Sequence, residues 1–199
     1  MVTEKKQQIL DTALLLFVEQ GIQATATAKI AKQANVATGT LFHHFSNKQE
    51  LVVTLYRSIK DELSQSISQN TADNVGSSDN QADALKSTIE SYWHQAIEWA
   101  MSHPLKWQFL QQFANDPQFK ISQQQDVMTS SMAFLVEAIE QGQQQGILAP
   151  LPIPLVLNYC HYHYLAVTTL FIEQPELFQQ PSYQDGAFQM FWQGLVAKP

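Results

Sequence analysis

The segment Thr40-Leu41-Phe42-His43-His44-Phe45-Ser46-Asn47-Lys48 combines groups that can bind base edges with one that can bind phosphate. Hydroxyl and imidazole groups form hydrogen bonds with base edges, and a phenyl ring or a threonine methyl can contact the methyl group of thymine. Lys48 lies where a following helix would begin, so its charge would add to a helix N-terminal dipole facing a phosphate. A short helix with these side chains outward is suited to a DNA groove.

Two helices are predicted before this segment. Residues 5–20 carry apolar side chains at helical spacing, and Gly21 can end that helix in a left-handed cap. A second helix begins near Thr25 or Thr27, and either hydroxyl can cap it. The apolar positions that define these two helices are Ile9, Ala13, Phe17, Ile30, Ala31 and Ala34.

A third helix, Thr38–Phe45, follows a tight turn at Asn35, a residue type that tolerates positive φ. Its expected buried positions are Leu41 and Phe45, and Val36 is expected to re-enter the core before it. Two helices joined by a three-residue turn form a helix-turn-helix. Geometry alone leaves a purely structural three-helix unit as an alternative.

The residues of this region resemble the DNA-binding domain of TetR-family transcriptional regulators over residues 5 to about 55. The matching positions are Ile9, Ala13, Phe17, Gly21, Thr25, Ile30, Ala31, Ala34, Val36, Gly39, Thr40, Leu41, Phe42, His43, His44, Phe45, Lys48 and Leu51. The resemblance implies a homodimer whose two recognition helices enter successive major grooves of a palindromic operator in double-stranded DNA. It also implies a C-terminal domain that binds a small-molecule effector and thereby releases the DNA.

The resemblance also assigns DNA-binding roles to particular side chains. The residues that would face the bases and the nearby backbone are Thr38, Gly39, Thr40, Phe42 and His43. Those that would hold phosphates are Thr27, His44 and Lys48. Two alternatives stay open: Phe42 packs on the next helix, and His44 is merely solvated.

Some positions depart from the family pattern. Phe42 stands where the family usually has tyrosine, so a hydroxyl contact to phosphate is absent. Asn35-Val36-Ala37 replaces the usual Gly-Val-Ser, which removes the serine that customarily caps the third helix. Ala26 and Ala28 replace residues that often contact DNA. Weaker anchoring to the DNA backbone is therefore expected.

The remaining sequence predicts an all-α fold. Ser46 or Asn47 can cap a fourth helix of more than 20 residues, and residues 70–81 have the composition of a loop. The further predicted helices cover about 82–103, 105–115, 122–145, 154–174 and 182–196. The predicted domains are a helix-turn-helix domain at 1–50, which includes the start of the connecting fourth helix (47–69), and a helical effector-binding and dimerisation domain at 51–199.

Charge and composition restrict where nucleic acid can bind. The net charge is −7, yet residues 1–60 hold seven basic and four acidic side chains, a balance of +3, while the rest carries −10. Binding is therefore expected to be local to the first third and salt-dependent. The one cysteine permits no internal disulfide, and no apolar run approaches the length of a membrane span. The sequence indicates a cytoplasmic protein with no membrane partner.

Aromatic and sulfur side chains after residue 90 indicate an apolar effector cavity. Two stripes at helical spacing are the predicted lining: Trp93, Ile97 and Met101, and Trp107, Leu110 and Phe113. Tyr162 or His163 could supply a polar group. Cys160 and His163 have a spacing compatible with metal ligation, but no second ligand pair is near in sequence, so neither metal nor cofactor is expected. A plain core role for these residues remains open.

The last two long predicted helices carry more apolar surface than one subunit readily covers, which agrees with the dimer that the resemblance implies. A different class of protein remains as an alternative: an α-helical small-molecule-binding protein or enzyme whose N-terminal domain is structural. The chain lacks G-x-S-x-G, P-loop and HExxH motifs, so no enzyme is predicted. Control by a protein partner in place of an effector is also compatible with the sequence.

Overall fold

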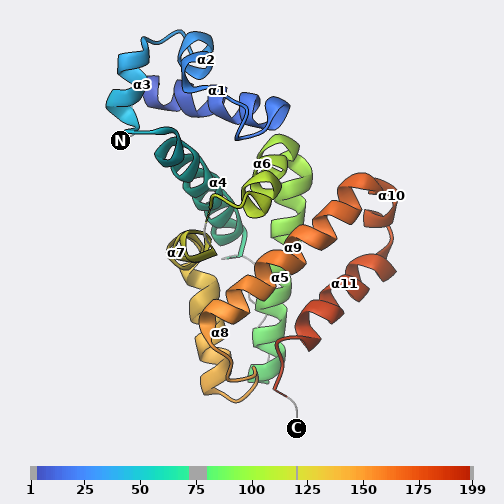
Figure 1. Cartoon of the computed structure of the whole chain (residues 1–199). Helices are drawn as coiled ribbons and strands as arrows, with labels where there is room; N and C mark the ends of the chain where they lie inside the picture. Colours follow the sequence, from blue (N-terminus) through green and yellow to red (C-terminus); the bar gives the residue numbers. More distant parts are fainter. Residues whose placement is uncertain (1–3, 72–79, 120, 198–199) are drawn as a thin grey trace. The chain divides into compact units, whose positions relative to one another are not determined.

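The computed structural model describes residues 4–71, 80–119 and 121–197, and these residues form helices without any strand (Figure 1). The all-α prediction is confirmed. The helices are α1 (Glu4–Gln20), α2 (Thr27–Gln33), α3 (Thr38–His44), α4 (Lys48–Thr71), α5 (Gln81–Ser102), α6 (Pro104–Asn115), α7 (Ile121–Ser131), α8 (Ala133–Gln144), α9 (Ile153–Glu173), α10 (Pro175–Phe178) and α11 (Pro181–Gln193). The predicted loop at 70–81 falls mostly on residues 72–79, which lie outside the described residues. None of the described helices is both long and apolar enough to cross a membrane.

Packing divides the chain into two compact units. The first unit is Met1–Ile59 with His103–Lys120, and the second unit is Lys60–Ser102 with Ile121–Pro199. Among the described helices, α4 contributes residues to both units, and α6 belongs to the first. The domains expected from the sequence, 1–50 and 51–199, are defined by DNA binding and by effector binding with dimerisation. They stay a prediction.

In the first unit, α1, α2 and α3 form the predicted helix-turn-helix (Figure 1, blue). Gly21 has φ of +84° and ends α1, and Asn35 has φ of +51° in the turn between α2 and α3. Both predictions of left-handed backbone are confirmed. Val36 is half-buried, and its N–H donates to the Ala31 carbonyl oxygen at 3.0 Å. The turn is thus fixed by backbone geometry.

The prediction that a threonine side chain caps α2 is wrong. Ala26 occupies the N-cap position, and no side chain caps the helix. Thr25 is instead 1% exposed, and its hydroxyl lies 2.8 Å from the Gly21 carbonyl oxygen and 3.2 Å from that of Leu16. The Gly21 carbonyl lies just after the end of α1, where carbonyl groups have no helical partner. Thr25 therefore stabilises the end of α1 instead of the start of α2.

The N-terminus of α4 is capped as expected. The Asn47 side-chain oxygen accepts a hydrogen bond from the Glu50 N–H at 2.8 Å. The Glu50 carboxylate in turn accepts from the Ser46 N–H at 2.7 Å and from the Ser46 hydroxyl at 2.5 Å. This reciprocal pair resembles a capping box and lowers the pKa of Glu50. The chain is thereby fixed just after α3.

Helix α6 completes the first unit with an aromatic core. Pro104 occupies its first turn, where the missing N–H of proline costs nothing. Phe109 stacks on Phe17 of α1, with ring centroids 6.0 Å apart, and Phe113 stacks on Tyr56 of α4 at 4.0 Å. The rings are fully buried. The core that supports the helix-turn-helix therefore includes a segment about 100 residues later in the sequence.

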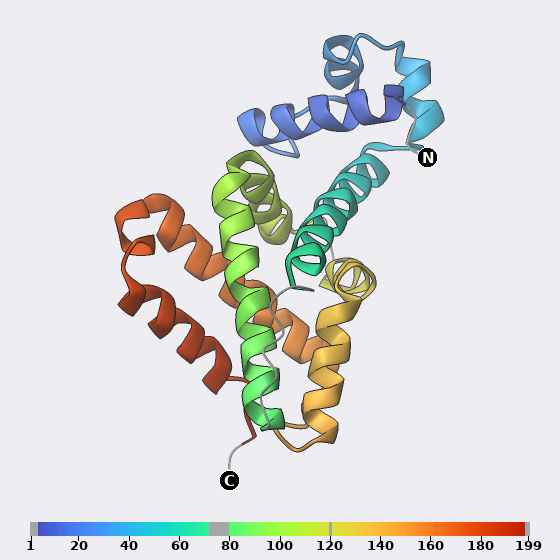
Figure 2. The same ribbon diagram turned by 180° about the vertical axis from the view of Figure 1, so that it is seen from behind.

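In the second unit, the single helix predicted for 122–145 is two helices, so that prediction is wrong. Met132 separates α7 from α8 with φ −113° and ψ 40°, and the two helices run in different directions (Figures 1 and 2). The Ser130 hydroxyl donates back to the Asp126 carbonyl, and the Ser131 hydroxyl donates to the Asp61 carboxylate at 2.5 Å. Serine side chains that bind in this way compete with the helical backbone.

The C-terminal helices α9 and α11 are joined by the short helix α10, which was not predicted (Figure 2). Pro175 and Pro181 lie in the first turns of α10 and α11, where proline favours a helix start. The last helix ends at Gln193, three residues before the predicted Val196. Val196 instead forms an isolated antiparallel bridge with Leu148.

We expect Thr25→Val to lower the free energy of unfolding by about 1–2 kcal/mol, because it keeps the shape of the side chain but removes a buried hydroxyl and its bond to α1. Urea unfolding followed by circular dichroism measures the change. Thr27→Val is the matched control, because Thr27 is half-buried and does not cap α2, and it should change stability by less than about 0.5 kcal/mol. Equal effects of the two substitutions would contradict this role of Thr25.

Candidate functional site

Helix α3 presents one buried and one exposed face. Leu41 and Phe45 are 0% and 1% exposed, as predicted, and they hold the helix against the first unit. Phe42 on the other face is 45% exposed, so it is not enclosed by α4. Of the other residues predicted to face the bases, Thr38, Gly39 and His43 are exposed and Thr40 is half-buried. A continuous polar and aromatic surface results.

Gly39 is the small residue of this surface. A methyl group built at its Cα would meet no atom within 4 Å. Since the space beside Gly39 is open, its lack of a side chain is not required by packing within the protein. A glycine at an exposed helix position also lowers helix stability by about 1 kcal/mol relative to alanine. An exposed glycine here leaves the backbone of α3 accessible to the surface of another molecule.

The structure brings three predicted DNA-binding residues together in one shallow hollow. Thr27, Phe42 and Lys48 line it, together with Asn47 and residues 23–26, which precede α2. Lys48 Nζ donates to the Gln23 carbonyl oxygen at 2.9 Å. Partial burial lowers the pKa of Lys48, and the charge of Asp116 opposes that shift. A lysine held in this way offers its charge at a fixed place on the surface.

His44, the third predicted phosphate ligand, is half-buried at the end of α3. Its ring packs edge-on against His43, with centroids 5.4 Å apart, and lies 6.4 Å from the Phe45 ring. His44 is not among the residues that line the hollow. The two histidines are therefore neighbours on one helix end, with His43 the more exposed of the pair.

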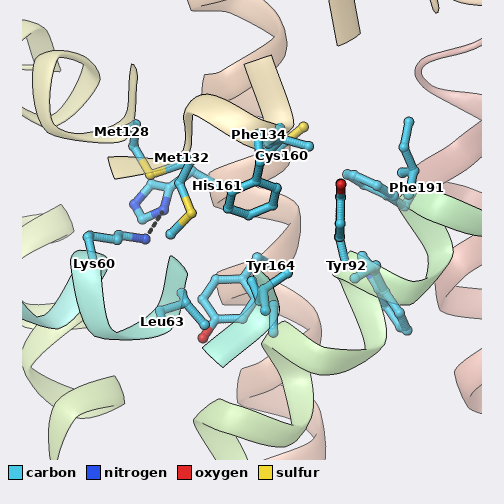
Figure 3. A pocket seen from close by; sticks show the side chains of 15 residues that line it. Lys60, Leu63, Tyr92, Met128, Met132, Phe134, Cys160, His161, Tyr164 and Phe191 are labelled. Atoms are coloured by element: carbon cyan, nitrogen blue, oxygen red, sulfur yellow. Dashed lines mark hydrogen bonds between the residues drawn. The ribbon is translucent and has the colours of Figure 1, made fainter. Parts of the chain in front are cut away.

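The second unit contains a largely apolar cavity with about 580 Å³ of space free of protein atoms, part of it open to solvent (Figure 3). Its described lining comprises Lys60, Leu63, Ile67, Ile89, Tyr92, Trp93, Ala96, Met128, Met132, Phe134, Leu135, Cys160, His161, Tyr164 and Phe191. The walls thus come from α4, α5, α7, α8, α9 and α11.

Three polar side chains meet on one side of this cavity. Lys60 is 1% exposed, and its Nζ lies 3.5 Å from His161 Nδ1 and 5.7 Å from the centre of the Tyr164 ring (Figure 3). Burial lowers the pKa of Lys60 to about 7. Burial, together with the charge of Lys60, lowers the pKa of His161 well below its usual value. Burial likewise raises the pKa of Tyr164, which stays neutral.

Only part of the predicted effector lining belongs to this cavity. Trp93 lines it, whereas Ile97 is buried nearby on α5 without lining it and Met101 is half-buried. His163 is half-buried and packs against Trp93 and Phe191, and Tyr162 is 39% exposed. The remaining predicted residues, Trp107, Leu110 and Phe113, are buried in the first unit.

Sequence reasoning missed Lys60 and His161. Lys60 follows Tyr56 by four residues and precedes Leu63 and Ile67 by three and seven, so it occupies a position of the buried stripe of α4. A lysine at a core position of an amphipathic helix was the available signal. Among the described residues, no cluster of three or more His, Cys, Asp or Glu side chains could hold a metal ion.

An exposed helix-turn-helix surface on one unit and an apolar cavity in a second, helical unit define the class of helix-turn-helix transcription regulators with a separate helical domain. Comparison with known proteins supports this class. The family model described as "Bacterial regulatory proteins, tetR family" matches residues 9–55. A solved structure of a tetR family transcription regulator from Shewanella sp. PV-4 is 40% identical, covers 98% of this chain and 100% of its own, and superposes with a TM-score of 0.87. The chain belongs to the TetR family of transcriptional regulators.

More distant relatives are also named as regulators. The HTH-type transcriptional repressor KstR2 of Mycobacterium tuberculosis is 28% identical over 160 residues, which are 79% of this chain and 76% of the repressor. The fatty acid metabolism regulator protein of Bacillus subtilis is 40% identical over 53 residues, 27% of each chain. The expectation of a DNA-binding regulator instead of an enzyme is confirmed by this family membership.

The buried lysine should make stability depend on pH. The pKa of Lys60 is about 7 in the folded protein and about 10.4 in an unfolded chain, so unfolding takes up a proton between these values. The free energy of unfolding should therefore rise from pH 7 to 9, by at most about 1.4 kcal/mol per pH unit. Lys60→Met should remove this rise, which urea unfolding at pH 7, 8 and 9 measures.

The expected rise in the free energy of unfolding is limited to the range from pH 7 to 9 because Cys160 also titrates at higher pH. Burial raises the pKa of the Cys160 thiol to about 12, so above pH 9 the unfolded chain loses a proton that the folded protein keeps, and this loss offsets the rise due to Lys60. Identical slopes in the wild type and Lys60→Met would show that Lys60 keeps an ordinary pKa in the folded protein.

Proposed function

We propose that this protein is a homodimeric, cytoplasmic repressor that binds a palindromic operator in double-stranded DNA through α3 and leaves it when a small, largely apolar effector enters the cavity. The observation that carries the proposal is the two-faced recognition helix. Leu41 and Phe45 fix α3 from behind, and the residues from Thr38 to His43 on its other face stay accessible. A helix fixed in this way can enter a major groove without unfolding.

The proposed contacts divide into two kinds. Thr27, His44 and Lys48 bind phosphates and set the position of the domain, and such contacts carry no sequence information. His43 binds base edges, Phe42 contacts thymine methyl groups, and Gly39 lets the helix backbone approach the DNA. Because the acidic remainder of the chain repels phosphates, binding depends on the local positive charge and weakens as salt concentration rises.

Release by an effector is supported by the cavity and by the relatives. The cavity walls are mostly aliphatic, aromatic and methionine side chains, which suit an apolar molecule. The relatives include one named for fatty acid metabolism and one described as a ketosteroid transcriptional regulator, both classes of largely apolar metabolite. An effector shifts the equilibrium between two states of the dimer by its difference in affinity for them. Helix α4, which begins at Lys48 and contributes Lys60 to the cavity, is the proposed connection.

A homodimer is supported by exposed apolar side chains on the two C-terminal helices. Leu155, Tyr162 and Leu170 are exposed along α9, at spacings of seven and eight residues. On α11, Tyr183 and Met190 are 42% and 72% exposed. Spacings of seven and eight residues place side chains on one face of a helix. A second copy of the chain covers these faces in the proposed dimer.

DNA binding tests the proposal directly. The protein is first used to select its operator from random duplexes, and the affinities of variants are then measured by fluorescence anisotropy at several salt concentrations. Lys48→Ala should weaken binding to all sequences about equally and reduce the salt slope by about one. His43→Ala should cost about 1–3 kcal/mol at the base pairs it contacts and relax the preference there. Wild-type affinity in both variants would contradict the proposed docking.

Gly39→Ala is the sharpest control for folding in this series. The added methyl group enters open space and alanine favours a helix, so the variant should be as stable as the wild type or more stable. It should nevertheless bind the operator more weakly, because the methyl group separates α3 from the DNA. A variant that gains stability and keeps full affinity would show that α3 does not approach the duplex at Gly39.

The dimer should be sensitive to a charge on α11. Met190→Glu places a carboxylate in the proposed interface and should raise the dimer dissociation constant by about 100-fold, because an unpaired charge is costly to bury. Sedimentation measures the change. Leu15→Glu is the matched control, since Leu15 is 48% exposed on α1, and it should leave the dimer intact. A dimer that tolerates Met190→Glu would place the interface elsewhere.

A further inference from the structure

The lining of the cavity is partly exposed on only one side. Among its described lining residues, four are half-buried: Tyr92, Ala96, Phe134 and Leu135. All four belong to α5 or α8. The lining residues from α4, α7, α9 and α11 are buried. The partly exposed part of the described lining is thus confined to the wall that α5 and α8 form.

A second hollow, the α5–α8 groove, is lined by the same two helices and by Gln145, the residue after α8. It has about 800 Å³ of space free of protein atoms, including space that is open to solvent. Besides Tyr92, the polar side chains of its described lining are Gln81, Thr88, Glu137, Gln141 and Gln145. These side chains favour a hydrated groove, in contrast to the apolar cavity.

Tyr92 and Phe134 lie between the groove and the cavity. Among the described residues, these two line both hollows. Their rings pack edge to face with centroids 4.7 Å apart, and Figure 3 shows them side by side, away from Lys60. Burial raises the pKa of Tyr92, and the charge of Glu137 raises it further, so the Tyr92 hydroxyl is close enough to the groove to interact with that carboxylate. One ring pair is therefore shared by a polar groove and an apolar cavity.

This ring pair can move without a movement of the helices. Partly exposed side chains change rotamer rapidly, and an edge-on pair of rings is held by a weak attraction. Other aromatic residues of the lining are fixed more firmly. Trp93 and Phe191 are 5% and 4% exposed, and both pack against the fully buried Phe188. The Tyr92–Phe134 pair is thus the aromatic part of the lining that opens at the lowest cost.

We propose that Tyr92 and Phe134 form the gate of the effector cavity, and that a ligand passes between them from the α5–α8 groove. This inference rests on the proposed function, because it assigns the route by which an effector reaches the cavity. The closed pair keeps water from the apolar walls, and rotation of either ring joins the two hollows. A rival route would pass Met128 and His161, which also line a hollow of only about 210 Å³, but both residues are buried.

Cys160 is a native reporter of entry, because it lines the cavity and is the one cysteine of the chain. Its reaction with methyl methanethiosulfonate, a small uncharged thiol reagent, is followed by mass spectrometry of the full chain. In Gln141→Cys, fluorescein maleimide is first attached to the introduced cysteine, which is exposed in the groove and reacts well before the buried Cys160. This label fills the groove and should slow the reaction of Cys160 at least about tenfold. The same label on Glu140→Cys, exposed on α8 but outside the groove, should change the rate less than about twofold.

Phe134→Ala tests the gate itself. Removal of the ring should speed the reaction of Cys160 at least about tenfold, and the label on Gln141→Cys in the same chain should cancel this gain. Local unfolding near Cys160 would also speed the reaction, but a label in the groove would not slow it. Leu135→Ala is the matched control, because Leu135 is a half-buried lining residue outside the groove, and it should change the rate less than about threefold.

The gate would be overturned by an unchanged rate after labelling at position 141, or by equal slowing from labels at positions 140 and 141. An acceleration in Phe134→Ala that persists with the label in place would overturn it as well, and so would a Cys160 that stays unmodified in both the wild type and Phe134→Ala. In these cases the assignment of the cavity to an effector would stand, with another route of entry. A gate that passes every test in a protein whose operator no ligand releases would contradict the proposed function alone.

Discussion

The shortness of the recognition helix is the constraint on which the account of this protein depends. Helix α3 has seven residues, too few to be stable alone in water. It is helical because Leu41 and Phe45 are buried, each burial contributing about 1.5–3 kcal/mol. The same packing fixes which side chains remain outside, and Phe42 and His43 are among them. Stability on one face and the proposed DNA recognition on the other both follow from a single orientation of this helix.

Along the chain, helix α4 follows α3 and contributes residues to the cavity lining. Its N-terminus, held by Asn47 and Glu50, follows α3 directly, and Lys60 lies twelve residues after Lys48, a rise of about 18 Å along one helix. An effector that binds in the cavity shifts the proposed equilibrium only by its difference in affinity for the two states.

The sequence predicted those parts that local residues determine. Gly21 and Asn35 fixed two turns because few other residues adopt positive φ, and the buried positions of α3 followed from helical spacing. The break at Met132 was missed because no proline or glycine marks it, and Ser131 binds Asp61 from 70 residues away. The stripe of Trp107, Leu110 and Phe113 was predicted to line the effector cavity, but it is buried in the first unit, because helical spacing predicts a buried face and not the core to which it belongs. Lys60 was missed although it lies in the buried stripe of α4, because lysines are rarely buried and distant helices decide whether one is.

A site-directed cross-link tests the central claim most directly. The one native cysteine, Cys160, is buried with a thiol pKa of about 12, so a cysteine introduced in place of His43 can be modified alone with a photoreactive group. On the selected operator, this group should cross-link to bases in two half-sites about one helical turn apart. The same group at the exposed Glu140 of α8 should give only background. Cross-linking from position 43 that does not exceed this background would show that α3 is not the helix that reads DNA.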